Sequence, residues 1–383
     1  MDKFIDQLPF FTTEHRTLAA RIESFVSNEI EARAFEERDA DACLREFVSS
    51  LAKAGVLRYA VASPGIKLDV RALCLIREAL SYSSALADLA FVMQGLGTYA
   101  ISQAAPEHVR DFWISRATEG KAIAAFALTE PGAGSDVAAI TTAAKRDGDA
   151  YVIDGSKRFI SNAGVADFYT VFARTGTDAK GRAALSAFVV GAKMPGFSVT
   201  ERTAMIAAHP IGEIEFKGCR VPAEDMVGAE GDGFVLAMRT MDTFRASVGA
   251  AACGMARRAL NEAVQYATNR KQFGRLLSEH QLIQEKLADM VTELDAARLL
   301  VYRAAYLSDM GTDRVTREAS EAKLYATEAA CRIIDSAVQI HGGAGLVRGS
   351  VVERLYRDVR ALRIYEGTSE IQKLIIAGQL LKE

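Results

Sequence analysis

The most informative stretch of this sequence runs Tyr365-Glu366-Gly367-Thr368-Ser369-Glu370-Ile371-Gln372-Lys373-Leu374. A carboxylate stands beside a glycine between two helical patterns, so it can project from a backbone bend, lie buried against a ligand and act as a base. A simpler interpretation is that Gly367 ends one helix and Thr368 caps the next, with Glu370 favourable in its first turn. This stretch alone favours the simpler interpretation. Other segments of the chain are needed to distinguish it from a catalytic role for Glu366.

Composition and charge bound the class of protein. The chain has 383 residues, of which 50% are hydrophobic and 25% charged, as in a globular protein with two or three structural units. Its net charge of −3 argues against a nucleic-acid partner and against a polybasic membrane anchor. The N-terminus lacks a signal-peptide core, and no apolar run approaches transmembrane length. We therefore expect a cytoplasmic protein with no membrane partner.

The cysteines carry no sign of a disulfide framework or of a zinc site. The chain has five of them, an odd number, far apart and without a Cys-x-x-Cys pair. We expect reduced, mostly buried thiols and no metal.

Hydrophobic patterning divides the chain into three predicted domains. Residues 1–119 follow a helical pattern, including a segment at 85–100 that is apolar almost all round. Residues 120–227 carry short apolar runs separated by Gly, Pro and Asp, which predicts a small β-barrel or sandwich. Residues 228–383 return to long amphipathic helices, which predicts a helical bundle. The predicted fold class is therefore an α+β multidomain protein with an α–β–α order along the chain.

Individual elements can be predicted within this frame. Asp147-Gly148 between two apolar runs is a hairpin signal, and Pro106 is typical of the first turn of a helix. The pattern is not an alternating βαβ, and no Gly-x-Gly-x-x-Gly follows a strand, which argues against a Rossmann fold. Strands are expected at 122–128, 140–145, 151–153, 169–173, 185–190 and 214–216.

Two segments of the central domain could contact a ligand. Residues 127–136, Ala-Leu-Thr-Glu-Pro-Gly-Ala-Gly-Ser-Asp, end a strand in a glycine-rich turn with two hydroxyl donors, although a tight loop without a ligand explains them equally well. Residues 157–164, Lys-Arg-Phe-Ile-Ser-Asn-Ala-Gly, place Phe159 and Ser161 on one face of a strand. A flat ring system could stack there, but an ordinary half-buried strand is the favoured interpretation of that segment alone.

Two segments of the C-terminal domain have similar potential. Residues 269–275, Asn-Arg-Lys-Gln-Phe-Gly-Arg, form a basic loop before His280-Gln281, and guanidinium groups suit a pyrophosphate. A solvated charge cluster is the default alternative. Residues 339–345, Gln-Ile-His-Gly-Gly-Ala-Gly, offer exposed amides to a phosphate or carbonyl, and His341 within them is expected to be a hydrogen-bonded structural residue.

The Thr-Glu-Pro-Gly-Ala-Gly-Ser-Asp, Arg-Lys-Gln-Phe-Gly, Gln-Ile-His-Gly-Gly-Ala-Gly and Tyr-Glu-Gly-Thr-Ser-Glu-Ile-Gln segments occur in this order over most of the chain. In this respect the sequence resembles the acyl-CoA dehydrogenase family. The resemblance implies a helical domain, a β-barrel domain and a C-terminal four-helix bundle. It also implies FAD-dependent oxidation of an acyl-CoA to the trans-2-enoyl thioester, in fatty-acid or branched-chain acyl metabolism.

The resemblance implies a set of cofactor contacts. The flavin ring and its ribityl chain would be held by Phe126, Leu128, Thr129, Gly134, Ser135, Phe159 and Ser161. FAD would also be reached across a subunit interface by Arg270, Phe273, Gln281, Gln339, Gly342 and Gly343, with Thr368 and Glu370 completing the site. Such shared sites imply a homo-oligomer, typically a tetramer in this family, and electron-transfer flavoprotein would be the acceptor.

Glu366 matches the family's catalytic base. Some members carry the base on an earlier helix instead, where this chain has Phe244, which cannot accept a proton. By the same resemblance, hydride would pass from the β-carbon of the substrate to flavin N5. The implied substrate contacts are Ser135, Asp242, Arg245, Tyr365 and Gly367.

Three alternatives remain open. A related acyl-CoA oxidase would hand its electrons to O₂, and the flavin segments are compatible with both enzymes. A carrier-protein thioester could replace the CoA ester, because residues 205–212, Met-Ile-Ala-Ala-His-Pro-Ile-Gly, depart from the family's arginine followed by a small polar residue. A non-catalytic flavin- or acyl-binding scaffold is disfavoured by the presence of Glu366 and of the flavin segments.

Overall fold

A computed structural model describes residues 3–34, 39–63, 65–177, 181, 183–312 and 314–382. The chain divides into two compact units, each built from separate stretches of sequence. The first comprises Met1–Glu37, Asp69–Asp88 and Phe244–Glu383, and the second comprises Arg38–Leu68 and Leu89–Thr243. Within the residues described, no helix has the length and apolar character needed to cross a membrane.

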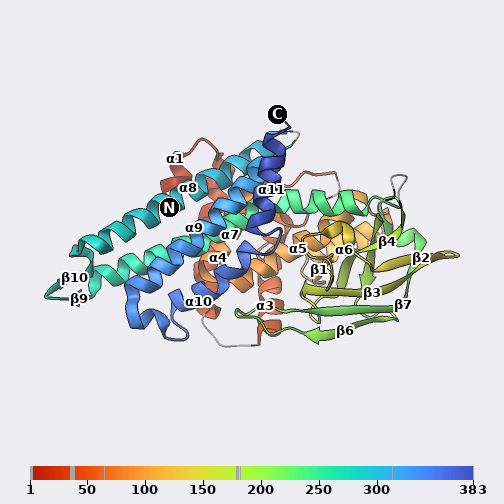
Figure 1. The fold of residues 1–383 in the computed structure, drawn as a ribbon, viewed down its shortest axis with the longest axis horizontal. Coiled ribbons are helices and arrows are strands. Elements are labelled where there is room, and N and C mark those ends of the chain that lie inside the picture. Colours follow the sequence, from red (N-terminus) through yellow and green to blue (C-terminus); the bar gives the residue numbers. More distant parts are fainter. Residues whose placement is uncertain are drawn as a thin grey trace. The chain divides into compact units, whose positions relative to one another are not determined.

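The first unit is helical, and the long helices α7, α8 and α9 run along one another in it (Figure 1). A short hairpin, β9 with β10, connects α7 to α8. The elements lying wholly or partly in this unit are α1 (Lys3–Gln7), α2 (Thr13–Phe25), α4 (Val70–Ser83), α5 (Ala85–Ala104), α7 (Gly233–Asn269), β9 (Lys271–Gln272), β10 (Arg275–Leu276), α8 (Gln281–Asp309), α9 (Thr316–His341), α10 (Val351–Val359) and α11 (Ser369–Leu380).

Small residues allow the helices of this unit to pack closely. Alanines dominate the buried faces of α7 and α9. Gly254 lies on α7 where an added Cβ would be only 2.1 Å from the carbonyl oxygen of Glu78 on α4. Ser81 of α4 donates a hydrogen bond of 2.8 Å to the carbonyl of Ala251. The backbones of α4 and α7 can therefore come this close only because residue 254 has no side chain.

The second unit contains an eight-stranded sheet among its described residues, with β1 beside β4 and the others in the order β6-β7-β3-β2-β4-β5-β8. Neighbours are antiparallel except that β1 and β2 run parallel to β4. The elements lying wholly in this unit are α3 (Ala40–Lys53), α6 (Glu107–Thr118), β1 (Ala124–Ala127), β2 (Ala143–Asp147), β3 (Ala150–Ser161), β4 (Phe168–Thr177), β5 (Ala183–Gly191), β6 (Phe197–Arg202), β7 (Ile211–Pro222) and β8 (Met226–Val227).

Most of the predicted elements are present, with shifted boundaries. The hairpin predicted at Asp147-Gly148 is confirmed, because β2 and β3 pair antiparallel around Gly148, whose φ is +64°. The strand predicted at 122–128 is shorter, and the one predicted at 151–153 is far longer. Pro106 is the N-cap of α6, so it precedes the first turn instead of lying in it. The domain boundaries at 119/120 and 227/228 stay a prediction.

Candidate active site

Glu366 lies in the turn that leads into α11. Its φ is +52°, in the left-handed region that residues other than glycine seldom adopt, and the φ of Gly367 is +94°. Thr368 is the N-cap of α11, and its Oγ1 accepts a hydrogen bond of 3.3 Å from the N–H of Ile371. Backbone strain of this kind concentrates at functional sites. Thr368 therefore caps a helix, as the simpler interpretation held, and Glu366 stands on a strained bend directly before it.

Two buried side chains hold this turn from two different helices. Lys323 of α9 is fully buried, and its Nζ donates a hydrogen bond of 2.7 Å to the carbonyl of Gly367. Gln372 of α11 is also fully buried, and its Nε2 donates to the carbonyls of Glu366 and Gly367 at 3.1 and 3.0 Å. These bonds fix the strained backbone, because breaking either one would leave a buried polar group unsatisfied.

The Glu366 side chain has unused hydrogen-bonding capacity. Its Oε2 is buried without a hydrogen-bond partner among the described residues. Within the same part of the chain, no hydrogen bond uses the backbone N–H of Glu366. Burial raises the pKa of Glu366, while the cations of Arg77, Lys323 and Arg245 counteract that rise. A carboxylate with a raised pKa and a free lone pair is suited to accept a proton from a weak carbon acid.

A buried ion pair lies next to this turn. Arg77 of α4 is 1% exposed, and its Nε and Nη2 donate to the two carboxylate oxygens of Asp88 on α5 at 2.8 and 2.7 Å. Its Nη1 donates to Ser247 Oγ of α7 at 2.9 Å. Burial raises the pKa of Tyr365, and the positive charge of Arg77 opposes that rise. The hydrogen bonds of one guanidinium thus connect α4, α5 and α7.

The remaining predicted substrate contacts on α7 differ in burial. Arg245 is 4% exposed in the first unit, and Phe244 beside it is fully buried. Asp242 precedes them on the same helix and is half-buried. Phe244 offers no carboxylate at the alternative position for a base, as the sequence indicated.

In the second unit, a buried ion pair clamps the glycine-rich turn at residues 127–136. Glu130 accepts hydrogen bonds from Thr141 N–H at 2.6 Å and from Thr142 N–H at 2.9 Å. Lys157 Nζ, which is fully buried, donates to Glu130 at 2.8 Å and to the carbonyl of Leu128 at 3.2 Å. Burial would raise the pKa of Glu130, but the Lys157 cation and these donors hold it at about 2.

The clamp leaves an open surface on this turn. An added Cβ at Gly132 or Gly134 would meet no atom within 4 Å, and Ser135 is exposed. Phe126 and Thr129 are half-buried, whereas Leu128 is buried. Exposed backbone amides and nearby hydroxyl groups can form hydrogen bonds with the carbonyl and N–H groups at the edge of a flat ring system.

The segment around Phe159 departs from a regular strand. The pairing of β3 with β7 shifts register between Lys157 and Ile160, and Phe159 has a φ of +55°. The regular alternation used to predict the face of Phe159 and Ser161 therefore does not apply at this bulge. The Phe159 ring is 51% exposed, and Ser161 is half-buried.

Ser161 has a partner that the sequence did not reveal. Its Oγ lies 2.8 Å from Nε2 of His209, in the segment noted for its unusual sequence. Burial lowers the pKa of His209 to about 4, so the imidazole is neutral at physiological pH. A neutral ring can orient the Ser161 hydroxyl without placing a charge beside it.

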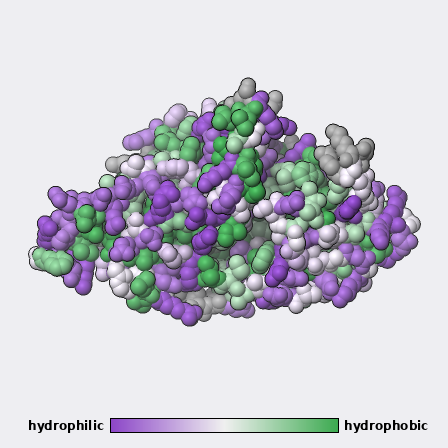
Figure 2. Space-filling view, viewed as in Figure 1, coloured by the Kyte–Doolittle hydropathy of each residue, from purple (hydrophilic) through white to green (hydrophobic). Residues whose placement is uncertain are grey.

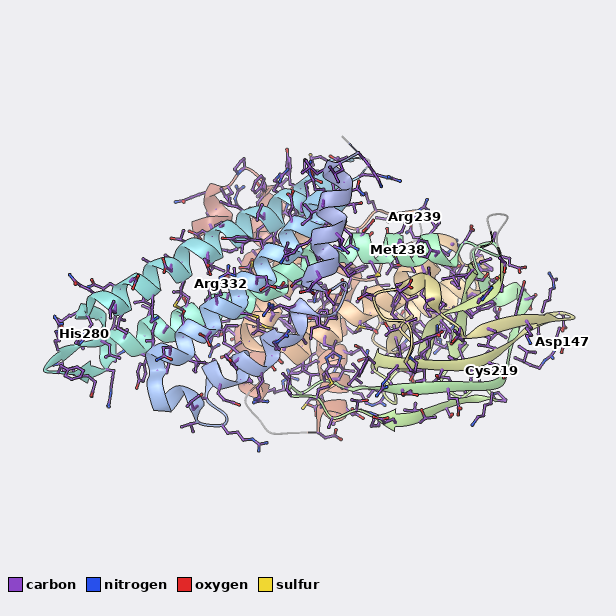
Figure 3. All side chains as sticks on the ribbon, in the orientation of Figure 1. Asp147, Cys219, Met238, Arg239, His280 and Arg332 are labelled. Atoms are coloured by element: carbon purple, nitrogen blue, oxygen red, sulfur yellow. The ribbon has the colours of Figure 1, made fainter. Side chains whose placement is uncertain are left out.

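The predicted contacts across a subunit interface lie on the surface of the first unit. Phe273, at the tip of the β9–β10 hairpin, is 94% exposed with a φ of +53°. His280 N-caps α8 at the end of the same hairpin (Figure 3). The ring of Tyr266 on α7 stacks on His341 at the end of α9, with 4.3 Å between centroids. The predicted residues exposed in this unit are Arg270, Phe273, Gln281, Gln339, Gly342, Gly343 and Glu370.

Three domain models of one protein family match consecutive parts of this chain. The family model of the acyl-CoA dehydrogenase N-terminal domain matches residues 12–121, that of the middle domain matches residues 125–219, and that of the C-terminal domain matches residues 231–381. The chain belongs to the acyl-CoA dehydrogenase family. The predicted enzyme class and fold class are thereby confirmed.

Three relatives match between 69% and 97% of this chain. The 3-(aryl)acrylate reductase of Clostridium sporogenes is 39% identical over 97% of this chain and 100% of that protein. The short-chain specific acyl-CoA dehydrogenase of Clostridium acetobutylicum is 36% identical over 97% of this chain and 99% of that protein. The caffeyl-CoA reductase-Etf complex subunit CarC of Acetobacterium woodii is 44% identical over 69% and 70%, respectively.

Solved structures of the same family agree. The butyryl-CoA dehydrogenase of Megasphaera elsdenii has a TM-score of 0.89 and 33% identity, covering 97% of this chain and 99% of that one. A glutaryl-CoA dehydrogenase of Mycobacterium smegmatis in complex with FADH2 has a TM-score of 0.87 and 26% identity, covering 99% and 97%. The predicted cofactor, FAD, is confirmed as that of the family.

The donor set of this acyl-CoA dehydrogenase suits FAD. The open glycine turn, the hydroxyls of Thr129, Ser135 and Ser161, and the half-exposed Phe159 ring offer hydrogen bonds and an aromatic face. Arg270 is exposed on the first unit and carries a charge complementary to a pyrophosphate.

Several residues around Glu366, Glu130 and Ser161 were missed by sequence reasoning. They are Arg77, Asp88, Lys323, Gln372, Lys157 and His209. Two of them left a signal, because Arg77 and Lys323 are charged side chains on otherwise apolar helix faces. Such a charge indicates a buried partner, but its partner lies far away in sequence and cannot be identified from spacing.

One other polar cluster resembles a set of metal ligands. His15, Asp69 and Asp309 each offer an atom within 4.8 Å of the others. These groups already have partners, because His15 Nε2 lies 3.0 Å from Asp69 and Asp309 accepts from Arg71 Nε at 2.7 Å. The expectation of no metal stays a prediction.

Proposed function

We propose that the chain removes a proton and a hydride from Cα and Cβ of an acyl-CoA thioester, with Glu366 as the base. The observation that carries the proposal is the buried Glu366 Oε2 without a hydrogen-bond partner among the described residues, on a strained turn fixed by Lys323 and Gln372. A base held in this way needs little reorganisation when it accepts the proton.

The chain's own groups account for the proton transfer. In the proposed reaction, the ionised carboxylate of Glu366 takes a proton from Cα of the acyl group. The thioester oxygen gains negative charge as the proton leaves, and we assign the unused N–H of Glu366 to stabilise it. Substrate would exclude water from the carboxylate and raise its pKa further, which strengthens the base. Bound FAD supplies the acceptor for the hydride from Cβ.

The proposed binding roles follow the family resemblance. Phe126, Thr129, Ser135, Phe159 and Ser161 would hold the flavin. The remaining cofactor contacts would be Leu128, Gly134, Arg270, Phe273, Gln281, Gln339, Gly342, Gly343, Thr368 and Glu370. The proposed substrate contacts besides Ser135 are Asp242, Arg245, Tyr365 and Gly367.

We further propose a homotetramer in which a second copy completes the cofactor site. The exposure of Phe273 at 94% supports this, since an aromatic ring at a hairpin tip is a costly surface residue without a partner. Hydrophobic side chains also gather over α11 in Figure 2, where Leu374 is 68% exposed.

Electron-transfer flavoprotein is the proposed electron acceptor. The relative named as a subunit of a caffeyl-CoA reductase-Etf complex supports this choice. Transfer to O₂ by an oxidase is the alternative. The cytoplasm is the proposed compartment, and the free cysteine thiols are consistent with it.

Operation in the reverse direction is a second candidate. Two relatives are named reductases of unsaturated acids or their CoA esters. The same groups would serve, with Glu366 protonated and donating its proton to Cα. Reduction would require FAD to be reduced first by an electron donor.

A substrate panel tests the proposal. Purified protein should be yellow with one FAD per subunit, and butyryl-CoA, longer and branched acyl-CoAs should be oxidised with an artificial electron acceptor. Stopped-flow reoxidation in air separates the oxidase, which would form peroxide rapidly. Acyl groups on carrier protein should react more slowly than the matching CoA esters. A folded, colourless preparation that cannot be reconstituted with FAD would contradict the proposal.

A further inference from the structure

The segment that leads into β7 has no role in the reaction proposed above, yet it is joined to the end of β3 at two consecutive residues. Nε2 of His209 lies 2.8 Å from Oγ of Ser161. The backbone N–H of Asn162 donates a hydrogen bond of 2.7 Å to the carbonyl of Pro210. The pairing of β3 with β7 also places Ser161 opposite Ile211. Backbone contacts directly after His209 therefore hold its ring beside the Ser161 hydroxyl.

The backbone at Ser161 has little freedom to move. Asn162, which follows it, is 1% exposed with a φ of +66°, and its Nδ2 donates a hydrogen bond of 2.9 Å to the carbonyl of Ala124 on β1. The carbonyl of Asn162 accepts hydrogen bonds from the N–H groups of Val165 and Ala166 at 2.9 and 2.8 Å. The freedom that remains to Ser161 is rotation about its side-chain bonds, and a hydrogen bond to the hydroxyl restricts that rotation.

The imidazole of His209 can hold this hydroxyl in two ways. A neutral ring has one donor and one acceptor nitrogen. When Nε2 carries the hydrogen, the ring donates to Ser161 and the serine proton is available to a ligand. When Nε2 carries no hydrogen, the serine donates to the ring and its Oγ can only accept from a ligand. Ser161 is the ring's one hydrogen-bond partner among the described residues. In either tautomer, the hydrogen bond gives the hydroxyl a fixed direction.

We propose that His209 is a positioning residue for the cofactor: it holds the Ser161 hydroxyl in the orientation in which that hydroxyl contacts the ring system of FAD. This inference rests on the proposed contact between Ser161 and FAD. An oriented hydroxyl binds a ligand more tightly than a freely rotating one, because its rotamer is selected before binding. The second hydrogen bond also polarises the hydroxyl, since connected hydrogen bonds strengthen one another. His209 thus acts on FAD through Ser161.

Two substitutions of His209 separate the hydrogen bond from the bulk of the side chain. His209→Leu removes the partner of Ser161 and should raise the Kd of FAD roughly three- to tenfold, the range expected for one neutral hydrogen bond. His209→Gln can donate to or accept from the same hydroxyl, so it should restore the Kd to within about twofold of wild type. The visible absorption bands of the bound flavin should shift in His209→Leu and return to their wild-type positions in His209→Gln.

A second background and a matched control isolate the contact. In Ser161→Ala, FAD should bind more weakly, and adding His209→Leu should change the Kd no further, so the two substitutions are not additive. His108 of α6 lies 2.9 Å from Asp225 in the same unit and has no assigned cofactor contact. His108→Leu should therefore leave the Kd of FAD unchanged. Far-UV circular dichroism of each holoenzyme checks that the variants are folded.

A contact that only stabilises the fold would give a different result. His209→Leu would then lower the unfolding free energy without changing the Kd of FAD or the flavin spectrum, or would raise the Kd by the same factor with and without the Ser161 hydroxyl. Either result would overturn the inference, and so would a Ser161→Ala protein that binds FAD as tightly as wild type. The Kd of FAD does not depend on proton transfer, so these outcomes are distinct from failure of the proposed reaction, which flavin reduction in Glu366→Gln tests.

Discussion

At the residue scale, the candidate site depends on where buried polar atoms are satisfied and where they are not. Lys323 and Gln372 donate hydrogen bonds to backbone carbonyls, and Arg77 donates to the Asp88 carboxylate and the Ser247 hydroxyl. Glu366 Oε2 is left without a partner among the residues described. Burying a carboxylate oxygen without a hydrogen-bond partner costs free energy. The proposed role of Glu366 as a base accounts for this cost, because the free oxygen is the atom that would accept the proton.

His209 should make stability depend on pH. Its folded pKa of about 4 is below the ordinary 6.5, so the neutral ring stabilises the fold above pH 6.5. That contribution is lost as the pH falls from 6.5 toward 4, because the unfolded chain binds the proton first. Because His209 is half-buried and water partly screens its charge, we expect an effect on the order of 1–2 kcal/mol.

The substitution His209→Gln tests whether His209 causes this pH dependence of stability. Gln retains a hydrogen bond to Ser161 but does not titrate. Denaturant unfolding at pH 7 and pH 5 should show a smaller loss of unfolding free energy in the variant than in wild type. Equal losses in the two proteins would show that the pH dependence has another source.

Sequence reasoning at this scale identified Glu366 and the segments proposed for FAD, because each carries its chemistry within a few consecutive residues. It did not find the Ser161–His209 contact, since the two residues are 48 positions apart and meet through the pairing of β3 with β7. It also assumed regular alternation at Phe159, where a bulge breaks it. Contacts between distant residues and local irregularities leave no periodic signal.

At the element scale, α4 approaches α7 closely, and Arg77 Nη1 of α4 donates a hydrogen bond of 2.9 Å to Ser247 Oγ of α7. Gly254 permits this approach, as an added Cβ would lie 2.1 Å from Glu78 O and 2.2 Å from Ser81 Oγ. The helical patterns of residues 1–119 and 228–383 predicted helices in the regions of α4 and α7. Their spacing could not be predicted, because a glycine inside a helical pattern does not reveal which backbone it faces.

Gly254→Ala should therefore destabilise the first unit. The added methyl group cannot be accommodated without moving a helix backbone, which should cost about 1–3 kcal/mol. Thermal and denaturant unfolding would measure the change.

Gly378→Ala on α11 is the matched control. An added Cβ there meets nothing within 4 Å, so the helix propensity of alanine should leave stability unchanged or raise it slightly. A Gly254→Ala protein as stable as the Gly378→Ala protein would contradict the packing described for α4 and α7.

At the scale of the whole molecule, the order of helical, β and helical segments was predictable because each has its own hydrophobic period over many residues. The division into two compact units was not predicted, because the first unit combines the internal segment Asp69–Asp88 with the N-terminal and C-terminal parts of the chain. Hydrophobic period reports local structure and carries no information on which distant segments share a core.

The proposed oligomer makes a prediction about FAD retention. Arg270→Ala removes a guanidinium assigned to the pyrophosphate and should weaken FAD binding by about 2–4 kcal/mol, with little effect on the chemical step of the protein that remains loaded. FAD released on gel filtration would measure the first effect, and single-turnover flavin reduction the second.

Arg332→Ala provides the comparison. Arg332 is an exposed arginine of α9 that pairs with Glu293 at 2.8 Å, and it has no assigned cofactor contact (Figure 3). Its removal should leave FAD retention unchanged. If Arg270→Ala holds FAD as tightly as Arg332→Ala, the placement of Arg270 at the cofactor is wrong.

The central claim, that Glu366 is the base, is tested most directly by anaerobic flavin reduction in Glu366→Gln. The substitution keeps the shape of the side chain and removes the group that accepts the proton. The variant should bind FAD and butyryl-CoA normally, while bleaching of the flavin by substrate should slow by several orders of magnitude, because Phe244 offers no replacement. Reduction at a near-normal rate would contradict the account.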